Sequence, residues 1–178
     1  DESIKLIKPL GLLTAKPIIY ATNVAEEDLA NGNKYCDEMV KLAEGEDAEV
    51  IRISAQVESE LSDLGESEQI DYLESLGVQE GGLKSLIKAT YRLLGLRTYF
   101  TTGEKETRAW TIKEGMTAPN AAGVIHTDFE RGFIRAQTIG YEKLLEAGSL
   151  ASARNRGWLR SEGKEYVVKE GDVIEFLF

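Results

Sequence analysis

The sequence predicts an α/β protein in two parts, a strand–helix–strand unit followed by a small domain built on a mixed β-sheet. Two apolar runs near residues 20 and 50 enclose an amphipathic helical segment, which is the pattern of a parallel βαβ unit. From residue 96 the hydrophobic period changes to two, which favours strands. Charge also divides the chain, since residues 1–96 hold 9 basic and 19 acidic side chains whereas residues 97–178 hold 12 of each.

The first part begins with a strand that ends in a polar loop. Residues 17–22 (PIIYAT) form a short β-rich run that stops at Asn23. Residues 34–43 (KYCDEMVKLA) fit an amphipathic helix, and residues 49–54 (EVIRIS) form a second apolar strand, which Ala55 and a polar loop follow. Two strands joined by a helix of this length are expected to pair in parallel.

This βαβ unit is too small to be a whole sheet. Nothing before Pro17 resembles a further strand, and residues 70–76 and 83–94 instead have helical spacing, the second segment starting after Gly81-Gly82. Parallel sheets are covered on both faces and normally hold several strands. We therefore expect residues 1–95 to be the last part of a larger α/β domain whose opening strands lie outside this sequence.

The second part alternates short strands with short helices. The expected strands are 97–102, 107–112, 132–139, 165–168 and 172–178, and the expected helices are 120–125, 141–147 and 150–156. About five short strands packed on one or two helices in roughly 80 residues form the pattern of a ubiquitin-like β-grasp.

Composition excludes several classes of protein. The apolar content of 42% and the single cysteine, Cys36, do not fit fibrous, disordered or disulfide-rich chains. The net charge of −10 argues against nucleic-acid binding by the whole chain. The first residues lack a basic leader and a long apolar span, so we expect a cytoplasmic protein without membrane association, or one from an organelle stroma if a transit segment was removed.

Neither Cys36 nor the one histidine, His126, carries a catalytic pattern. Cys36 lies in a helical segment without companion ligands, so packing at or near the core is expected rather than a metal site. His126 has no Ser, Cys or carboxylate at an evident catalytic spacing. We expect it to be a packed or hydrogen-bonded turn residue.

Two long stretches in the second part carry a specific resemblance. Residues 108–139 (RAWTIKEGMTAPNAAGVIHTDFERGFIRAQTI) and 163–178 (GKEYVVKEGDVIEFLF) resemble the TGS domain of the YchF family of Obg-related P-loop NTPases, also called Obg-like ATPases. In the first part, IIYATNVAE at 18–26 and the strand ending in Ser54-Ala55 resemble that family's base-recognition segment and its following Ser-Ala motif. The resemblance covers essentially the whole chain.

The resemblance implies a domain plan and an activity for the intact protein. Residues 1–95 would be the C-terminal part of its nucleotide-binding domain, with the exit of the family's helical insertion at 1–12, and residues 96–178 would be the TGS domain, a β-grasp. The intact protein is expected to bind ATP with Mg²⁺, to hydrolyse ATP, and to associate with the ribosome or RNA.

No phosphate-binding motif of the form G-x-x-x-x-G-K-[ST] occurs in the 178 residues. In the family, the P-loop, the Mg²⁺-binding residues and a water-positioning histidine belong to the N-terminal part. Positioning and neutralising the phosphates is most of phosphoryl-transfer catalysis. We therefore expect no hydrolysis by this chain alone, and we predict no catalytic residue and no metal ligand within it.

The sequence of the loop at 23–26, NVAE, predicts which nucleotide base the intact protein prefers. Typical GTPases have Asn-Lys-x-Asp here, but Val24 has no ammonium and Glu26 holds its carboxylate one methylene further out, so paired guanine contacts would be poorly aligned. Adenine's exocyclic amine donates while N7 and N1 accept, which suits an Asn side chain and a backbone group. The family resemblance also implies ATP.

We therefore predict a base site in which Asn23 reads the base and Val24 contributes its backbone or apolar packing. Ser54 and Ala55 would close the other side. Glu26 either contacts the base or interacts with a helix dipole. The alternatives are a turn or cap role for Asn23 and a plain strand end at Ser54.

A set of basic residues in the second part predicts contact with RNA or the ribosome, with Phe129, Phe133 and Trp158 nearby for stacking. The set is Arg131, Arg135, Arg154, Arg156, Arg160 and Lys164. Two alternatives stay open: the arginines pair with local acids while the aromatic rings form core, or the β-grasp is a protein-interaction surface or a lid on the ATPase.

Overall fold

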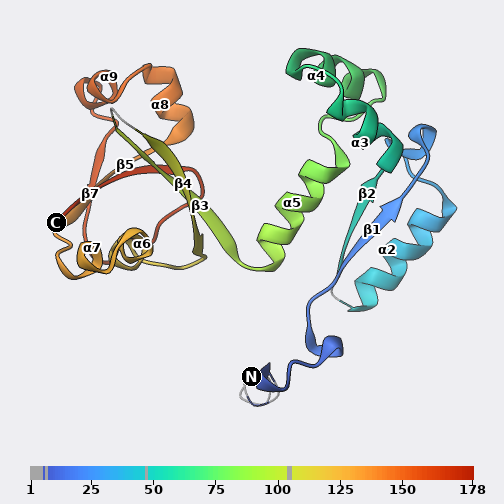
Figure 1. The fold of residues 1–178 in the computed structure, drawn as a ribbon, viewed down its shortest axis with the longest axis horizontal. Helices are drawn as coiled ribbons and strands as arrows, with labels where there is room; N and C mark the ends of the chain where they lie inside the picture. Colours follow the sequence, from blue (N-terminus) through green and yellow to red (C-terminus); the bar gives the residue numbers. More distant parts are fainter. Residues whose placement is uncertain (1–5, 7, 47, 104–105) are drawn as a thin grey trace. The chain divides into compact units, whose positions relative to one another are not determined.

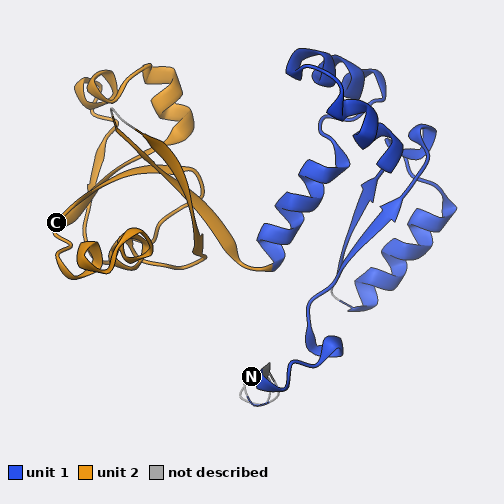
Figure 2. Cartoon of the chain, in the orientation of Figure 1, with its two compact units in different colours: residues 1–93 blue, residues 94–178 orange. Residues whose placement is uncertain are grey.

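The computed structural model describes residues 6, 8–46, 48–103 and 106–178. The chain divides into two compact units, Asp1–Leu93 and Leu94–Phe178 (Figure 2). Each unit has its own hydrophobic core, so each is described by itself. No helix in these described ranges is long and apolar enough to cross a membrane.

Unit 1 contains the expected βαβ element. β1 (Ile19–Asn23), α2 (Lys34–Glu46) and β2 (Glu49–Ile53) follow one another, and β1 pairs in parallel with β2 in a register that runs from Ile19 opposite Glu49 to Asn23 opposite Ile53. The carboxyl ends of both strands therefore lie at the same edge. The segment before β1 holds two short 3₁₀ turns, Lys8–Leu10 and Leu13–Ala15.

The exit of a helical insertion was expected at residues 1–12. Residues 1–5 and 7 of that span lie outside the described residues.

Three further helices complete unit 1. They are α3 (Ala55–Ser62), α4 (Glu66–Ser75) and α5 (Gly82–Leu93). Figure 1 shows α2 and α5 on opposite sides of the β1–β2 pair, with α3 and α4 beyond its carboxyl edge. The core of the unit joins the β1–α2 loop to α3 and α4 through buried Val24, Leu29, Cys36, Val57, Leu61 and Leu73.

The polar loop expected after Ala55 is instead helix α3, so that prediction was wrong. Ser54 is its N-cap, and the Val57 and Leu61 side chains, one turn apart, are buried on one helical face. The Ser54 cap and the Val57–Leu61 spacing were both visible in the sequence, but the acidic and polar residues between them hid a helix with only a narrow apolar stripe.

Unit 2 is a five-stranded mixed sheet. Its strands are β3 (Leu96–Thr102), β4 (Thr107–Lys113), β5 (Arg135–Gly140), β6 (Arg160–Glu162) and β7 (Asp172–Leu177). Their order across the sheet is β4-β3-β7-β5-β6, and the central β3–β7 pair is parallel while the other pairs are antiparallel. This order and orientation are those of the predicted β-grasp.

Helices cover both faces of this sheet. They are α6 (Ala118–Ile125), α7 (Thr127–Arg131), α8 (Tyr141–Ala147) and α9 (Leu150–Asn155). Ile174 of β7 belongs to a core shared with α6, whereas the preceding residue, Val173, belongs to a second core shared with α8 and α9. Because neighbouring residues of a strand point to opposite faces, β7 anchors both cores.

The strand expected at 165–168 was wrong. Only Val167 forms an isolated bridge there, to Thr117, and the fifth strand is Arg160–Glu162, paired with β5. Tyr166 and Val168 pack on the core while Val167 between them is exposed, so burial alternates here without a strand ladder. The period of two in the sequence therefore predicted which side chains are buried, but not whether the segment pairs in the sheet.

Candidate nucleotide-base site and arginine surface

The carboxyl edge of β1–β2 brings together the residues predicted to recognise a base. The backbone N–H of Val24 donates to the carbonyl of Ile53 at 2.9 Å, which extends the parallel ladder by one residue. The backbone N–H of Ala55 donates to Oδ1 of Asn23 at 3.0 Å. Asn23, Val24, Ser54 and Ala55 are thus linked into one small structure.

Asn23 is exposed, and one of its two amide atoms, Oδ1, already accepts a hydrogen bond. Because Oδ1 accepts from Ala55, Nδ2 is the end that is left to donate to a ligand. A ring nitrogen or a carbonyl oxygen would be a suitable acceptor. The expected turn role and the expected binding role are therefore compatible, since one side chain can do both.

Val24 faces inward. Its side chain is 9% exposed and packs in the core of unit 1 with Leu29, Cys36 and Val57. Only the backbone of Val24 can therefore face a ligand at this edge.

Ser54 is 1% exposed and acts as a helix cap. Its hydroxyl accepts from the backbone N–H of Val57 at 3.5 Å. The hydroxyl is thus committed to the start of α3, while Ala55, the first residue of that helix, is exposed. Together these two residues fix where the helix begins relative to Asn23.

Glu26 begins a short 3₁₀ turn, Glu26–Asp28, and is half-buried. Its carboxylate lies close enough to Tyr72 to contribute to a shift of that phenol: the pKa of Tyr72 is raised to about 12, first by its hydrogen bond to Glu60 and then by burial and the Glu26 charge. Helix α2 has a separate N-terminal cap, Asn33, whose Oδ1 accepts from the backbone N–H groups of Tyr35 and Cys36.

One residue at this edge was not predicted to matter. A Cβ atom on Gly82 would lie 2.8 Å from Cα of Ile53, so the first turn of α5 rests directly on the backbone at the end of β2. A Cβ on Gly81 would meet the flexible carboxylate of Glu58 at 3.0 Å and Cδ1 of Leu61 at an ordinary contact distance of 3.4 Å. The Gly-Gly pair was used only as a helix boundary, although two glycines together also signal a close backbone approach.

In unit 2, all six members of the predicted basic set are exposed, namely Arg131, Arg135, Arg154, Arg156, Arg160 and Lys164. Arg154 donates to Oε1 of Gln137 at 3.0 Å. The guanidinium of Arg156 lies 4.9 Å from the ring centroid of Trp158. A cation held over an aromatic face is a recurring feature of nucleic-acid surfaces, and also of ordinary protein surfaces.

Arg160 differs from the rest of the set because it belongs to a partly buried network. Its Nη2 donates to the Tyr166 hydroxyl at 3.0 Å and lies 3.5 Å from Oδ1 of Asp172, whose side chain is 4% exposed. Asp172 also accepts from the Tyr166 hydroxyl at 2.7 Å and from the backbone N–H of Lys169 at 2.9 Å. Burial, and next the bond to Asp172, raise the pKa of Tyr166.

The aromatic residues of unit 2 divide between core and surface. Phe133 is buried, and Trp158 is half-buried against the core on the α8–α9 face. Phe129 stacks on Phe178 at a centroid distance of 4.0 Å. His126 caps α7, its Nδ1 accepting from the backbone N–H of Asp128 at 3.2 Å, which is the hydrogen-bonded turn role expected of it.

Cys36 is buried, as expected. Among the residues that the structure describes, no group of three or more His, Cys, Asp or Glu side chains could hold a metal ion.

Known proteins match the chain along its whole length. Residues 96–178 match the family model YchF-GTPase_C, described as a protein of unknown function (DUF933). A Bacillus subtilis (strain 168) protein named ribosome-binding ATPase YchF is 56% identical over 100% of this chain and 49% of its own length. A protein of the same name from Escherichia coli O157:H7 is 48% identical over 99% of this chain and 48% of its own length.

Solved structures agree with these sequence matches. The structure of the Schizosaccharomyces pombe YchF GTPase superposes with a TM-score of 0.80 and 38% identity, covering 97% of this chain and 46% of that one. The chain thus spans about half the length of the relatives it matches. The predicted resemblance and fold class are confirmed, and the chain belongs to the YchF family, corresponding to the C-terminal part of the family's fold.

Proposed function

We propose that this chain is the base-recognising and C-terminal portion of a protein that binds and hydrolyses ATP and associates with the ribosome. The observation that carries the proposal is the bond from Ala55 to Asn23 at the carboxyl edge of β1–β2. Ligands of open α/β sheets bind outside this edge of the strands. Relatives named ribosome-binding ATPases support the activity and the partner.

Two residues beside Asn23, Val24 and Glu26, favour adenine over guanine. Nδ2 of Asn23 can donate to N7 of either purine, because Oδ1 is held by Ala55, so this contact binds the base without choosing between adenine and guanine. Val24 packs into the core and offers no cationic stem beside the base. Glu26 carries a longer carboxylate than the aspartate that pairs with guanine. Names of relatives differ on this point, ATPase for the curated proteins and GTPase for the Schizosaccharomyces pombe structure.

We assign the triphosphate, Mg²⁺ and hydrolysis to the rest of the same protein, since no P-loop motif occurs in these 178 residues. Phosphates and their metal are held by a backbone cradle of that kind. This portion would then choose the base, and the other portion would act on the γ-phosphate.

Calorimetry of the intact protein with ATP and with GTP, each with Mg²⁺, tests the base preference. We expect ATP to bind more tightly, and equal or reversed affinities would contradict the proposal. The same titrations with this 178-residue chain alone should give much weaker binding, because the phosphate contacts are missing.

A second function, RNA or ribosome contact by unit 2 as a TGS domain, is favoured by the exposed Arg154 and Arg156 beside Trp158. Exposed arginines bind phosphates, and a half-exposed indole can stack on a base. The net charge of this half is zero, so contact would depend on local geometry more than on overall attraction. Such a role implies a compartment with ribosomes, the cytoplasm or an organelle stroma.

The charge-reversal pair Arg135→Glu with Arg156→Glu tests this surface in the intact protein. Binding to ribosomes or to single-stranded RNA should weaken, and its salt dependence should become less steep, because fewer phosphates are neutralised. The matched control is Lys113→Glu with Lys143→Glu, two exposed cations outside the predicted basic set. An unchanged salt slope in the first pair would favour the protein-interaction alternative.

A further inference from the structure

A groove of about 450 Å³ crosses unit 1 between α3–α4 and the first turns of α5. Its floor includes Leu61 and Leu73, which are buried, and its sides include Ile70, Leu83 and Ile87, which are 52–54% exposed. Leu83 and Ile87 are one helical turn apart and form an apolar ridge on α5. A volume of this size is within the range of ordinary ligand sites.

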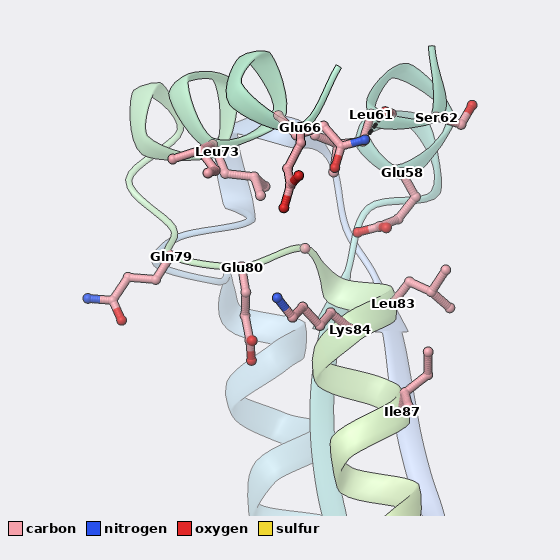
Figure 3. A pocket seen from close by; sticks show the side chains of 13 residues that line it. Glu58, Leu61, Ser62, Glu66, Leu73, Gln79, Glu80, Leu83, Lys84 and Ile87 are labelled. Carbon is pink, nitrogen blue, oxygen red and sulfur yellow. Dashed lines mark hydrogen bonds between the residues drawn. The ribbon is translucent and has the colours of Figure 1, made fainter. Parts of the chain in front are cut away.

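Two carboxylates enter the groove, from α3 and from α4. Figure 3 shows the side chains of Glu58 and Glu66 turned into the space between α3–α4 and α5, with Glu80 and Lys84 on the opposite side. The groove therefore combines an apolar floor with a concentration of negative charge, two properties that together restrict what could occupy it.

Two lysines near the groove interact with Glu80. Lys88 forms an ion pair with Glu80 at 2.5 Å, and Ser85 donates to the same carboxylate. The bond from Lys88 is the largest cause that lowers the pKa of Glu80, and the charge of Lys84 adds to the effect. Within the described ranges, Glu58 and Glu66 form no ion pair, and the groove lining holds three carboxylates, of Glu58, Glu66 and Glu80, against the one ammonium of Lys84, so its net charge is negative.

We propose that this groove docks a basic amphipathic helix of a protein partner. Leucine-like side chains of such a helix would cover the ridge of Leu83 and Ile87, and lysine or arginine side chains would reach Glu58 and Glu66. This is the usual way in which a helix lies in an apolar groove with charged rims. The inference does not depend on the proposed nucleotide site.

Charge decides against nucleic acid as the occupant. The first 96 residues carry a net charge of −10, and the groove lining is itself net negative, so phosphates would be repelled. The same field attracts basic segments and increases their rate of encounter. The groove contacts, rather than the overall charge, must supply specificity.

Methyl-resolved NMR of the full-length protein that carries this sequence, labelled on Ile and Leu methyl groups, tests the proposal. The probe is a leucine–lysine amphipathic peptide of about four helical turns. We expect saturable shifts at Leu61, Leu83 and Ile87. A leucine–glutamate peptide of the same pattern should cause none, and an oligolysine peptide should cause no saturable shift because it lacks the apolar face.

Matched charge removals separate docking from general attraction. Glu58→Gln with Glu66→Gln should weaken peptide binding about tenfold, whereas Glu38→Gln with Glu44→Gln, on exposed positions of α2, should change it less than about twofold. Equal effects of the two pairs, or shifts spread over unit 1, would overturn the proposal. Thermal melting of each variant checks that the fold is retained.

Discussion

The side chain of Asn23 accepts a hydrogen bond from the backbone N–H of Ala55 at 3.0 Å, across 32 positions of sequence. This bond joins the end of β1 to the first residue of α3. One amide end maintains the loop and the other is available for a ligand, so two substitutions at Asn23 can separate the two roles.

Asn23→Asp retains an oxygen for Ala55 but loses the Nδ2 donor, whereas Asn23→Ala loses both. In the intact protein we expect both variants to bind ATP at least about tenfold more weakly, which corresponds to about 1.4 kcal/mol. Only Asn23→Ala should also lower the melting temperature. Calorimetry and thermal melting measure the two effects, with Asn155→Ala at the end of α9 as the control. Normal ATP binding by Asn23→Asp would show that Nδ2 of Asn23 does not donate a hydrogen bond to the nucleotide.

Glu26→Asp should shift base preference toward GTP, because it shortens the carboxylate by one methylene. The adjacent exposed residue provides the control, Glu27→Asp, with the same chemical change. The ratio of ATP to GTP dissociation constants in the intact protein is the measurement. A ratio that changes equally in both variants would show that Glu26 does not contact the base.

Gly82→Ala should disturb the end of β2, since a Cβ there lies 2.8 Å from Cα of Ile53 and the backbone cannot give way easily. Overpacking of this kind costs about 1–3 kcal/mol of unfolding free energy. Displacement of Ile53 also moves Ser54 and Ala55, so ATP affinity should fall with it. Gly81→Ala is the matched control, because its closest contacts would be the mobile carboxylate oxygens of Glu58 and not backbone. Similar behaviour of the two alanine variants would contradict this packing role.

Arg160→Gln should destabilise unit 2 by about 1–2 kcal/mol, because Asp172 is 4% exposed and would lose its cation, although Arg160 itself is half exposed. Arg154→Gln, on the surface of α9, should leave the unfolding midpoint in urea nearly unchanged. If Arg160→Gln unfolds at the wild-type midpoint, the network contributes little, and Arg160 would be as available to RNA as its neighbours.

Tyr72 and Glu60 share a hydrogen bond that should appear in a pH titration. The bond raises the pKa of Tyr72 to about 12 and lowers that of Glu60 below its usual range. The stabilisation is present below the ordinary tyrosine pKa of 10.0 and is lost as pH rises through 12. On the acid side it is lost as pH falls through the lowered pKa of Glu60.

Ultraviolet titration of the phenols checks this pair. Wild type minus Tyr72→Phe should give one late transition near pH 12. A difference transition at the ordinary tyrosine pKa would contradict the bond.

The sequence was most informative where one pattern had one structural cause. The apolar-rich runs at Asp172–Phe178 and Pro17–Thr22 led to real strands, because burial and pairing coincide there. At 165–168 burial occurs without pairing, so periodicity alone misled. Helix α3 was missed because its stability comes from packing of Val57 and Leu61, not from its polar composition.

The candidate site was predictable in its residue types but not in its connections. Asn23, Ser54 and Ala55 were predicted from the local amino-acid sequence and from the family resemblance. That Ser54 caps a helix, that Val24 points inward and that Gly82 rests on Ile53 depend on tertiary packing, which a linear pattern does not encode. For the same reason Arg160 could not be separated from the exposed arginines before its buried partner Asp172 was known.

Helix α3 connects the base site with the groove. Its first residue, Ala55, is bonded to Asn23, and its last turn, with Leu61 and Ser62, lines the groove. Eight residues of rigid helix therefore connect base and groove. If an occupant of either end prefers one tilt of this helix, thermodynamic reciprocity requires the other end to respond by the same factor, so a nucleotide and a docked helix would report each other's presence.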